Sequence, residues 1–403
     1  MSFELLSPAG NLEKLKFAVY YGADAVYFSY KEFGLRSGAA NFTIEEMEKA
    51  LLFLHSKNKK GYATINIYAR DKDFKELEKL VYNLEKISID GFIISDPGII
   101  YFLSKLGVKK PIHLSTQANT TNLNAVKFWE DHGVKRIILA RELSLKEIDN
   151  ICKNTSIEIE VFIHGAMCIS YSGRCYLSNY MTKRDANRGQ CSHPCRWKYY
   201  LIEESREGEL FEVEEDENGS YILNSKDLCL IDYIPKLKDA GVKSFKIEGR
   251  MKSIFYTSLV TAVYRQALDS VDNNSGYYNS IERYKQILSM VSNRGYTNAF
   301  IDGGNDDTVN VDSSKYMRDG DFIGYLDNID SRVILHCRAK AKEGEELNIY
   351  MPDLVEKSFK LDNFYDYKSG KRSTVLKPNE KYIVKLPYKV QNFSLLLRKH
   401  NVK

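Results

Sequence analysis

The chain has 403 residues, of which 43% are hydrophobic and 28% charged, and its formal net charge is +4. This length suffices for one large domain with a sizeable core and a smaller second domain, and the mild charge permits an RNA partner without requiring one. The chain opens Met-Ser-Phe-Glu without the features of an export signal, and no stretch approaches eighteen uncharged apolar residues, so we expect a cytoplasmic protein with no membrane span.

Short β-rich runs alternate with amphipathic helical patterns over residues 1–270. The expected strands are Glu4–Ser7, Ala25–Ser29, Gly61–Ile67, Gly91–Ser95, Ile112–Ser115, Arg136–Leu139, Ile157–Ile163 and Ser244–Ile247. The expected helices include Asn11–Tyr21, Ile44–Ser56, Asp73–Ile87, Asn122–His132 and Ser144–Cys152. Strands that alternate with helices indicate βαβ units, and eight such units predict a closed (β/α)8 TIM-like barrel. Capping boxes at Thr43 with Glu46 and at Ser144 with Glu147 support two of the helix starts.

A long insertion, Gly165 to Ser225, interrupts this alternation after the seventh strand. Loops of this length are uncommon in compact domains and are usually functional or disordered. Its acidic run, Glu203–Glu217, predicts an exposed hairpin, and the next helix is expected near Leu228–Ala240, with Cys229 at its start. We expect a catalytic barrel over 1–275 with the insertion at 165–225, a helical connector over 276–315 and a small C-terminal antiparallel β-barrel over 316–403.

Five of the seven cysteines are clustered: Cys168, Cys175, Cys191, Cys195 and Cys229. Disulfides are rare in the cytosol, which leaves metal or thiol chemistry. Structural zinc sites usually contain cysteine pairs two to four residues apart, and here one pair is that close. Iron–sulfur clusters need four thiolates and occur with varied spacings. The spacing therefore favours an iron–sulfur cluster over zinc, and a lone catalytic cysteine would leave the other four unexplained.

Polar side chains follow the carboxyl ends of the expected strands. They are Ser7, Asn66, Asp96, Ser115, Gln117, Asn119, Arg141, Glu142, His164, Glu248 and Arg250. Reactive groups of such barrels project from these ends, so we expect a site for a small polar or anionic ligand there. Helix capping alone is an equally good explanation of Ser7, Asp96 and Ser115. The opposite ends of the strands, judged from Ala25 and Val242, are expected to be apolar.

The stretch from Arg174 to Lys198 is basic. It carries Arg174, Lys183, Arg184, Arg188, Arg196 and Lys198 against one acid, Asp185, and it also contains Tyr171, Tyr176, Tyr180 and Trp197. Basic residues mixed with aromatic residues suit phosphate and base-stacking contacts, and a solvated loop explains them equally well. No His-Glu-x-x-His or Gly-x-Ser-x-Gly hydrolase motif occurs, although a triad of distant residues stays open.

One segment carries a family resemblance. It reads Glu160-x-Phe162-x-x-Gly165-Ala166-Met167-Cys168-x4-Gly173-x-Cys175-x-Leu177-Ser178 and resembles, without a gap, the defining pattern of the collagenase-like peptidase family U-32. Similar segments are Leu6–Asn11, Gly22–Tyr27, Lys183–Asp185, Lys246–Lys252 and Ser292–Thr297. Relatives often have Gly-Gly where this chain has Ser29-Tyr30, which leaves ligand contacts after the second strand open.

Two further segments, Gln190–Trp197 and Leu223–Cys229, are most similar to family members that modify tRNA. The resemblance implies hydroxylation of the wobble uridine to 5-hydroxyuridine, with prephenate as a required metabolite. It also implies a 4Fe-4S cluster held by Cys168, Cys175, Cys191 and Cys229, with Cys195 the spare. Other family members are called peptidases or act in rRNA or ubiquinone hydroxylation. A peptidase and a non-catalytic RNA-binding subunit of a modification complex therefore stay open as alternatives.

The predicted roles of individual residues follow from this interpretation. Arg250 and Arg174 are candidates for bidentate contact with the carboxylates of a small dicarboxylate, because the planar guanidinium matches that geometry. The other candidates are His164 and Glu248 for catalysis, Asn66 and Gln117 for the uracil edge or the small ligand, and Tyr171 or Trp197 for stacking on the flipped base. The expected partners are tRNA and, in addition, an electron donor or a paralogous subunit.

Overall fold

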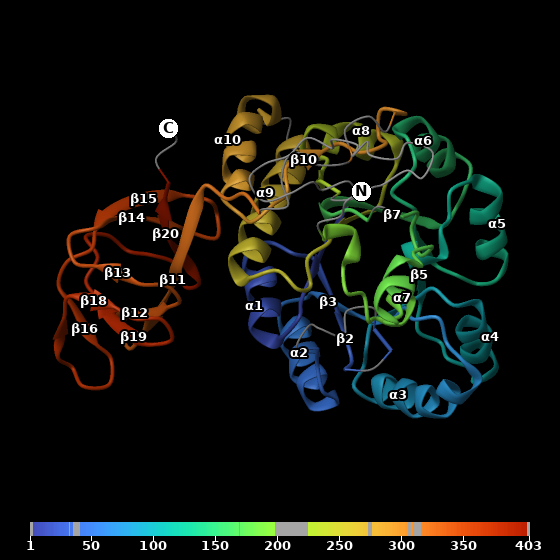
Figure 1. Ribbon diagram of the computed structural model, residues 1–403, viewed down its shortest axis with the longest axis horizontal. Coiled ribbons are helices and arrows are strands. Elements are labelled where there is room, and N and C mark those ends of the chain that lie inside the picture. The colour runs from blue at the N-terminus through green and yellow to red at the C-terminus, as the bar shows by residue number, and fades with distance from the viewer. Residues whose placement is uncertain are drawn as a thin grey trace, which may run out of the picture. The chain divides into compact units, whose positions relative to one another are not determined.

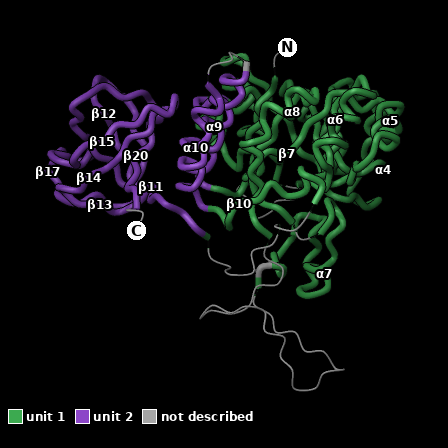
Figure 2. The backbone as a smooth tube through the Cα atoms, turned by 90° about the horizontal axis from the view of Figure 1, so that it is seen from above, with its two compact units in different colours: residues 1–19, 23–252, 293–316 green, residues 20–22, 253–292, 317–403 purple. Residues whose placement is uncertain are grey.

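The computed structural model describes residues 3–31, 33–34, 41–168, 170–197, 225–272, 276–304, 308 and 316–400. The predicted acidic hairpin at Glu203–Glu217 and Lys198 of the basic stretch lie outside these residues. The chain forms two compact units, one of residues 1–19, 23–252 and 293–316, and one of residues 20–22, 253–292 and 317–403 (Figure 2). The predicted connector and its limits stay a prediction.

The first unit is built on a closed barrel of eight parallel strands (Figure 1). The barrel strands are β1 (Glu4–Pro8), β2 (Ala25–Ser29), β3 (Lys60–Ile65), β4 (Gly91–Ile94), β5 (Ile112–Leu114), β6 (Arg136–Ile138), β7 (Glu158–Ala166) and β9 (Ser244–Ile247). Strand β9 pairs in parallel with both β1 and β7, which closes the barrel. The predicted (β/α)8 architecture is therefore confirmed.

The helices of this unit connect successive strands. They are α1 (Leu12–Tyr20), α2 (Ile44–Ser56), α3 (Phe74–Lys86), α4 (Pro97–Lys105), α5 (Leu123–Asp131), α6 (Leu145–Lys153) and α8 (Ile234–Ala240). Both predicted capping boxes are present, with Thr43 and Ser144 each accepting a hydrogen bond from the backbone N–H three residues on. These caps satisfy donors that helix ends otherwise leave unpaired.

The helix expected near Leu228–Ala240 begins later than predicted. Residues Asp227–Cys229 form a short strand, β8, which runs antiparallel to β7 with His164 opposite Cys229, and α8 starts only at Ile234. Cys229 therefore ends a strand rather than starting a helix. The reason is tertiary: the extended end of β7 offers backbone partners to β8, and a second short strand, β10 (Tyr296–Thr297), pairs with β8 on its other side.

The described part of the insertion packs onto the loops that follow β3 and β5. It contains α7 (Leu177–Thr182). Its Arg188 forms an ion pair of 2.8 Å with Asp73, which lies in the loop after β3. The Tyr68 hydroxyl donates to the backbone oxygens of Gln117 at 2.8 Å and Gly173 at 3.2 Å. Gly173 has a φ of 76°, and a Cβ there would lie 2.1 Å from the Gln117 oxygen. A side chain at this position would therefore push the insertion off the barrel.

The amino-terminal end of the barrel is more polar than the sequence predicted. Ala25 and Val242 are fully buried apolar residues, as expected. However, Arg136 at the start of β6 forms ion pairs with Glu4, Glu158 and Glu160. The expectation of an apolar end was wrong because it rested on two positions and could not foresee that carboxylates from β1 and β7 would meet one guanidinium.

The second unit contains two helices, α9 (Ile254–Asp272) and α10 (Tyr277–Ser289), and a curled antiparallel sheet. Its strands lie in the order β15 (Glu356–Lys360), β14 (Glu346–Tyr350), β20 (Ser394–Lys399), β11 (Gly320–Ile329), β12 (Arg332–Cys337), β19 (Lys381–Val384), β16 (Phe364–Asp366) and β17 (Arg372–Ser373). Strands β13 (Ala341–Lys342) and β18 (Val375–Leu376) form a separate pair. The predicted antiparallel C-terminal β-structure is confirmed.

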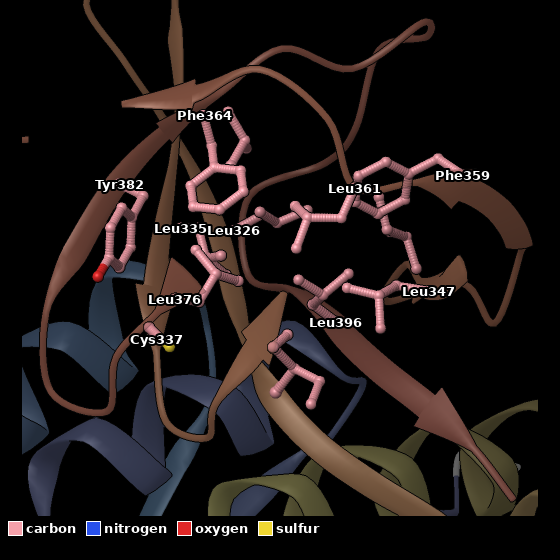
Figure 3. Close-up of a cluster of buried hydrophobic side chains, with 14 of the residues drawn as sticks. Leu326, Leu335, Cys337, Leu347, Phe359, Leu361, Phe364, Leu376, Tyr382 and Leu396 are labelled. Atoms are coloured by element: carbon pink, nitrogen blue, oxygen red, sulfur yellow. The ribbon is translucent and has the colours of Figure 1, made fainter. Parts of the chain in front are cut away.

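The concave side of this sheet holds its own hydrophobic core (Figure 3). Leu326, Leu335, Phe364 and Leu396 are fully buried there and come from four strands, β11, β12, β16 and β20. Because successive side chains of a strand point to opposite faces, one face of each strand supplies this core. None of the described helices in either unit has the length and apolar character needed to cross a bilayer.

Candidate active site at the barrel mouth

A small cavity of about 40 Å³ lies at the carboxyl ends of the barrel strands. Four of the predicted site residues line it together, namely Asn66, Gln117, Glu248 and Arg250. The structure therefore brings together side chains that follow three different strands. Arg141 and Lys246 also line this cavity, although the sequence analysis did not select them as ligand-binding residues.

The cations of this mouth cavity are held in fixed positions. The Arg250 side chain is 3% exposed, and its Nη1 donates to the Thr64 hydroxyl at 3.1 Å. The Lys246 ammonium contacts the Glu160 carboxylate at 2.8 Å, inside the barrel. Burial lowers the pKa of Lys246, and the Glu160 carboxylate opposes that shift. The positive charge of Lys246 is thus balanced within the barrel.

A second cavity, of about 110 Å³, is lined by four thiols: Cys168, Cys175, Cys191 and Cys195. It shares Thr116, Gln117 and Arg141 with the mouth cavity, so the two cavities adjoin. Cys229, predicted as the fourth ligand, is outside the described lining and ends β8 beside His164. The structure thus gathers three of the predicted ligands around one cavity together with the predicted spare cysteine.

Two of these thiols, Cys168 and Cys175, interact with each other. A hydrogen bond from Cys168 lowers the pKa of Cys175 to about 5, and the same contact raises the pKa of Cys168. The Cys191 sulfur lies 4.0 Å from Nδ1 of His193. Of the pair, Cys175 is the thiol more readily deprotonated, and the thiolate is the form that binds metals.

The donor chemistry of this thiol cavity fits an iron–sulfur cluster. All the cysteines are free thiols, and four of them surround one small space, which is the number that a 4Fe-4S cluster needs. Within the described residues, no three His, Cys, Asp or Glu side chains already lie in a metal-holding arrangement.

The remaining predicted residues are placed less favourably. His164 is 1% exposed and is not among the residues that line either cavity. Burial lowers its pKa to about 3. It is therefore uncharged at neutral pH. Arg174 is exposed and lies outside both described linings, and the same holds for Trp197. Tyr171 is exposed and lines the thiol cavity. The roles of all four stay predictions.

The basic stretch divides into structural and exposed parts. Arg188 is paired with Asp73 and also donates to the Tyr68 backbone oxygen at 2.7 Å, so it holds the insertion in place. The exposed side chains gather around α7: Tyr176, Tyr180, Lys183 and Arg184. This exposed group has the composition that suits contacts with single-stranded nucleic acid.

Arg141 is the site residue to which the sequence analysis assigned no individual role. It was among the polar residues after the strands, but nothing in its local sequence set it apart from the others. In the structure its Nη1 donates to the Ala166 backbone oxygen at 2.6 Å, and its guanidinium lies 4.1 Å from the centre of the Phe162 ring. These contacts fix it at the boundary of the two cavities.

The fold and the site together define a (β/α)8-barrel protein with a cation-lined mouth beside a thiol-lined cavity. The family comparison adds the particular class. The chain matches the model of peptidase family U32 over residues 10–310 and that of the U32 C-terminal domain over residues 318–398, and it belongs to this enzyme family.

Curated relatives cover most of the chain. It is 40% identical to a tRNA hydroxylation protein of Bacillus subtilis, over 90% of this chain and 87% of the relative. It is 34% identical to a tRNA hydroxylation protein of Escherichia coli, over 98% of this chain and 96% of the relative. It is also 34% identical to a protein named collagenase of Porphyromonas gingivalis, over 74% and 73% of the two chains.

Proposed function

We propose that this protein is a tRNA hydroxylase that converts the wobble uridine to 5-hydroxyuridine, with prephenate as a required small acid and a 4Fe-4S cluster as cofactor. The observation that carries the proposal is the pair of adjoining cavities, one lined by cations and one by four thiols. The similarity to tRNA hydroxylation proteins over nearly the whole chain supports the choice of substrate.

The cluster would be held by Cys168, Cys175 and Cys191, with Cys229 as the fourth ligand. The family pattern favours Cys229, whereas the lining of the thiol cavity favours Cys195. When bound, such a cluster would supply the electron-transfer capacity that hydroxylation of a base requires. A peptidase would not need it.

The small acid would bind at the barrel mouth, with the uracil beside it. Arg250 is buried in the mouth cavity and is the better placed of the two predicted carboxylate ligands, while Arg174 would act from the exposed rim. Asn66 and Gln117 would hydrogen-bond the uracil edge or the acid. Glu248 is the candidate for proton transfer within the cavity, and His164 would take that role only after a rearrangement that exposes it.

The tRNA would approach over the exposed aromatic and basic side chains around α7. Tyr176 and Tyr180 offer faces for base stacking, and Lys183 and Arg184 offer phosphate contacts. Tyr171, at the edge of the thiol cavity, or Trp197 would stack on the flipped base. The C-terminal sheet is proposed as a further RNA-contacting surface, and an electron donor or paralogous subunit would complete the system.

The test is nucleoside analysis by mass spectrometry of tRNA from a strain that lacks the gene. We expect 5-hydroxyuridine derivatives to disappear and to return with the wild-type gene but not with Cys168→Ala. Cys152→Ser is the matched control, because Cys152 lies on α6 and outside the described lining of the thiol cavity. Unchanged wobble uridine chemistry in the deletion strain would contradict the proposal.

A peptidase is the second candidate, favoured by the similarity to the collagenase of Porphyromonas gingivalis. This alternative expects peptide cleavage by pure protein without iron. Inactivity against a varied peptide library, measured beside a known collagenase, would exclude it. A non-catalytic RNA-binding subunit expects tRNA binding with no small acid in the barrel, so an acid released from the purified protein would argue against it.

A further inference from the structure

We propose that Arg141 binds one carboxylate of a small acid at the junction of the mouth cavity and the thiol cavity. This inference rests on the proposed function for the identity of the reaction. It deepens that function by naming the group that places the acid beside the thiols, whereas the sequence analysis assigned carboxylate binding to Arg250 and Arg174.

The position of Arg141 is the first argument. Arg141, Thr116 and Gln117 line both cavities, and Arg141 carries the formal charge among these three. A group bound by its guanidinium would therefore lie within reach of the mouth on one side and of the thiols on the other. The mouth cavity, of about 40 Å³, has room for little more than one carboxylate, so the rest of the acid would extend into the thiol cavity.

Arg141 also has a hydrogen-bond donor that is not used within the described residues. Its Nε is buried and has no hydrogen-bond partner among the described residues. The carboxylate next in the chain, Glu142, does not serve it, because Glu142 accepts from the backbone N–H of Ser172 at 2.9 Å and from its hydroxyl at 3.1 Å. A buried donor without an acceptor is unfavourable, and an incoming carboxylate would satisfy it.

The third argument is the charge around the mouth. Its charged lining consists of Arg141, Lys246, Glu248 and Arg250. Lys246 is neutralised by Glu160, which leaves two guanidinium groups against one carboxylate. The excess positive charge lies in a small, partly enclosed space, where electrostatic interactions are stronger than in water. The cavity therefore favours an anion over a neutral ligand.

The fourth argument is rigidity. The contact of Nη1 with the Ala166 oxygen at 2.6 Å and the packing of the guanidinium on the Phe162 ring hold the planar group in one orientation. A guanidinium fixed in this way can present two parallel N–H groups to a carboxylate, which a lysine ammonium cannot do. The arrangement is therefore specific for a planar anion and sensitive to replacement by lysine.

The experiment is ligand-observed NMR on the full chain, with succinate and phenylpyruvate as probes and succinamide as the uncharged match. Wild-type protein is expected to bind the two acids and not succinamide. Arg141→Gln should weaken acid binding by about 10- to 100-fold, and Arg141→Lys by about 10-fold, because a charged hydrogen bond contributes about 1.5–3 kcal/mol. Arg332→Gln, which removes an exposed arginine at the start of β12 in the C-terminal sheet, should leave acid binding unchanged.

Chemical rescue separates binding from folding. Guanidinium at low millimolar concentration should restore acid binding to Arg141→Ala, which a purely structural role of Arg141 would not allow. Equal acid binding by wild type and Arg141→Gln, or no acid binding by wild type, would overturn the proposal. Because these measurements contain no tRNA, a failure of hydroxylation with acid binding intact would count against the proposed function and leave the carboxylate position standing.

Discussion

The two ends of the barrel use similar charged residues for different purposes. At the amino-terminal end a cavity of about 630 Å³ is lined by residues that include Lys60, Tyr62, His113, Arg136 and Glu158, and it exceeds either cavity near the mouth in volume. The buried cation at that end, Arg136, is matched by carboxylates from β1 and β7. The positive charge of Arg136 is thus paired within the protein and is not available to a ligand.

At the mouth, Arg141 lies at the boundary of two smaller cavities and has a buried donor without a described partner. Neither cavity volume nor the number of charged residues distinguishes the proposed binding end of this barrel from the other end. The distinguishing feature is whether a buried charge already has its partners. A paired buried charge is satisfied within the fold and is costly to break, whereas an unpaired one is available for binding.

The largest expected effect is on tRNA hydroxylation and comes from the thiol cavity. Cys175→Ser should lose bound iron and sulfide and reduce tRNA hydroxylation more than about 100-fold, because a cluster with three thiolates is held poorly. Anaerobic purification with iron and sulfide analysis measures this. Full retention of iron and sulfide by the variant would remove the cofactor assignment.

The same analysis of Cys229→Ser and Cys195→Ser sharpens the ligand set. We expect Cys229→Ser to lose the cluster and Cys195→Ser to keep it, as the family pattern implies. The reverse result would assign the fourth position to Cys195, in agreement with the lining of the thiol cavity.

The next largest expected effect is a loss of stability at the amino-terminal end of the barrel. Arg136→Met should lower the free energy of unfolding by about 3–5 kcal/mol, because it leaves the largely buried Glu4 carboxylate without its cation and removes one of the two cations that contact Glu160. Urea denaturation measures the loss. Arg141→Met is the matched variant at the mouth and should cost much less, since it removes no ion pair among the described residues. Equal losses in the two variants would break the contrast between the ends.

His113, at the amino-terminal end of the barrel, should make the free energy of unfolding depend on pH. Burial, reinforced by the positive charge of Arg136, lowers the pKa of His113 well below 6.5. As the pH falls below about 6.5, His113 takes up a proton in the unfolded chain but stays neutral in the folded chain. The free energy of unfolding therefore decreases on acidification. Above this pH range His113 is neutral in both states and does not make the stability depend on pH. His113→Phe should flatten this loss by up to about 1.4 kcal/mol per pH unit, measured by urea denaturation between pH 7 and pH 5. An unchanged slope would show that His113 is protonated in the fold.

The smallest effect is expected at the rim of the large cavity. Lys135 is exposed, and Lys135→Gln should change the free energy of unfolding by less than about 0.5 kcal/mol. It should also leave tRNA hydroxylation unchanged, because the proposed reaction site lies at the opposite end of the barrel. A marked loss of activity with stability intact would show that this end binds a substrate.

The sequence by itself determined the barrel, the clustered cysteines and the family. Hydrophobic period and strand–helix alternation are local properties, and they placed the eight strands close to where the structure has them. The positions after those strands were enough to bring Asn66, Gln117, Glu248 and Arg250 to one mouth, because the carboxyl ends of parallel strands meet at one end of a barrel.

Only the tertiary structure decided which charges are paired. Arg136 and Arg141 are five residues apart and look alike in the sequence, yet the first meets carboxylates from residues 4, 158 and 160 and the second meets none among the described residues. The burial of His164 and the conversion of Asp227–Cys229 into a strand were likewise set by partners far along the chain. The physical reason is that pairing and desolvation depend on what the fold brings close, which local sequence does not contain.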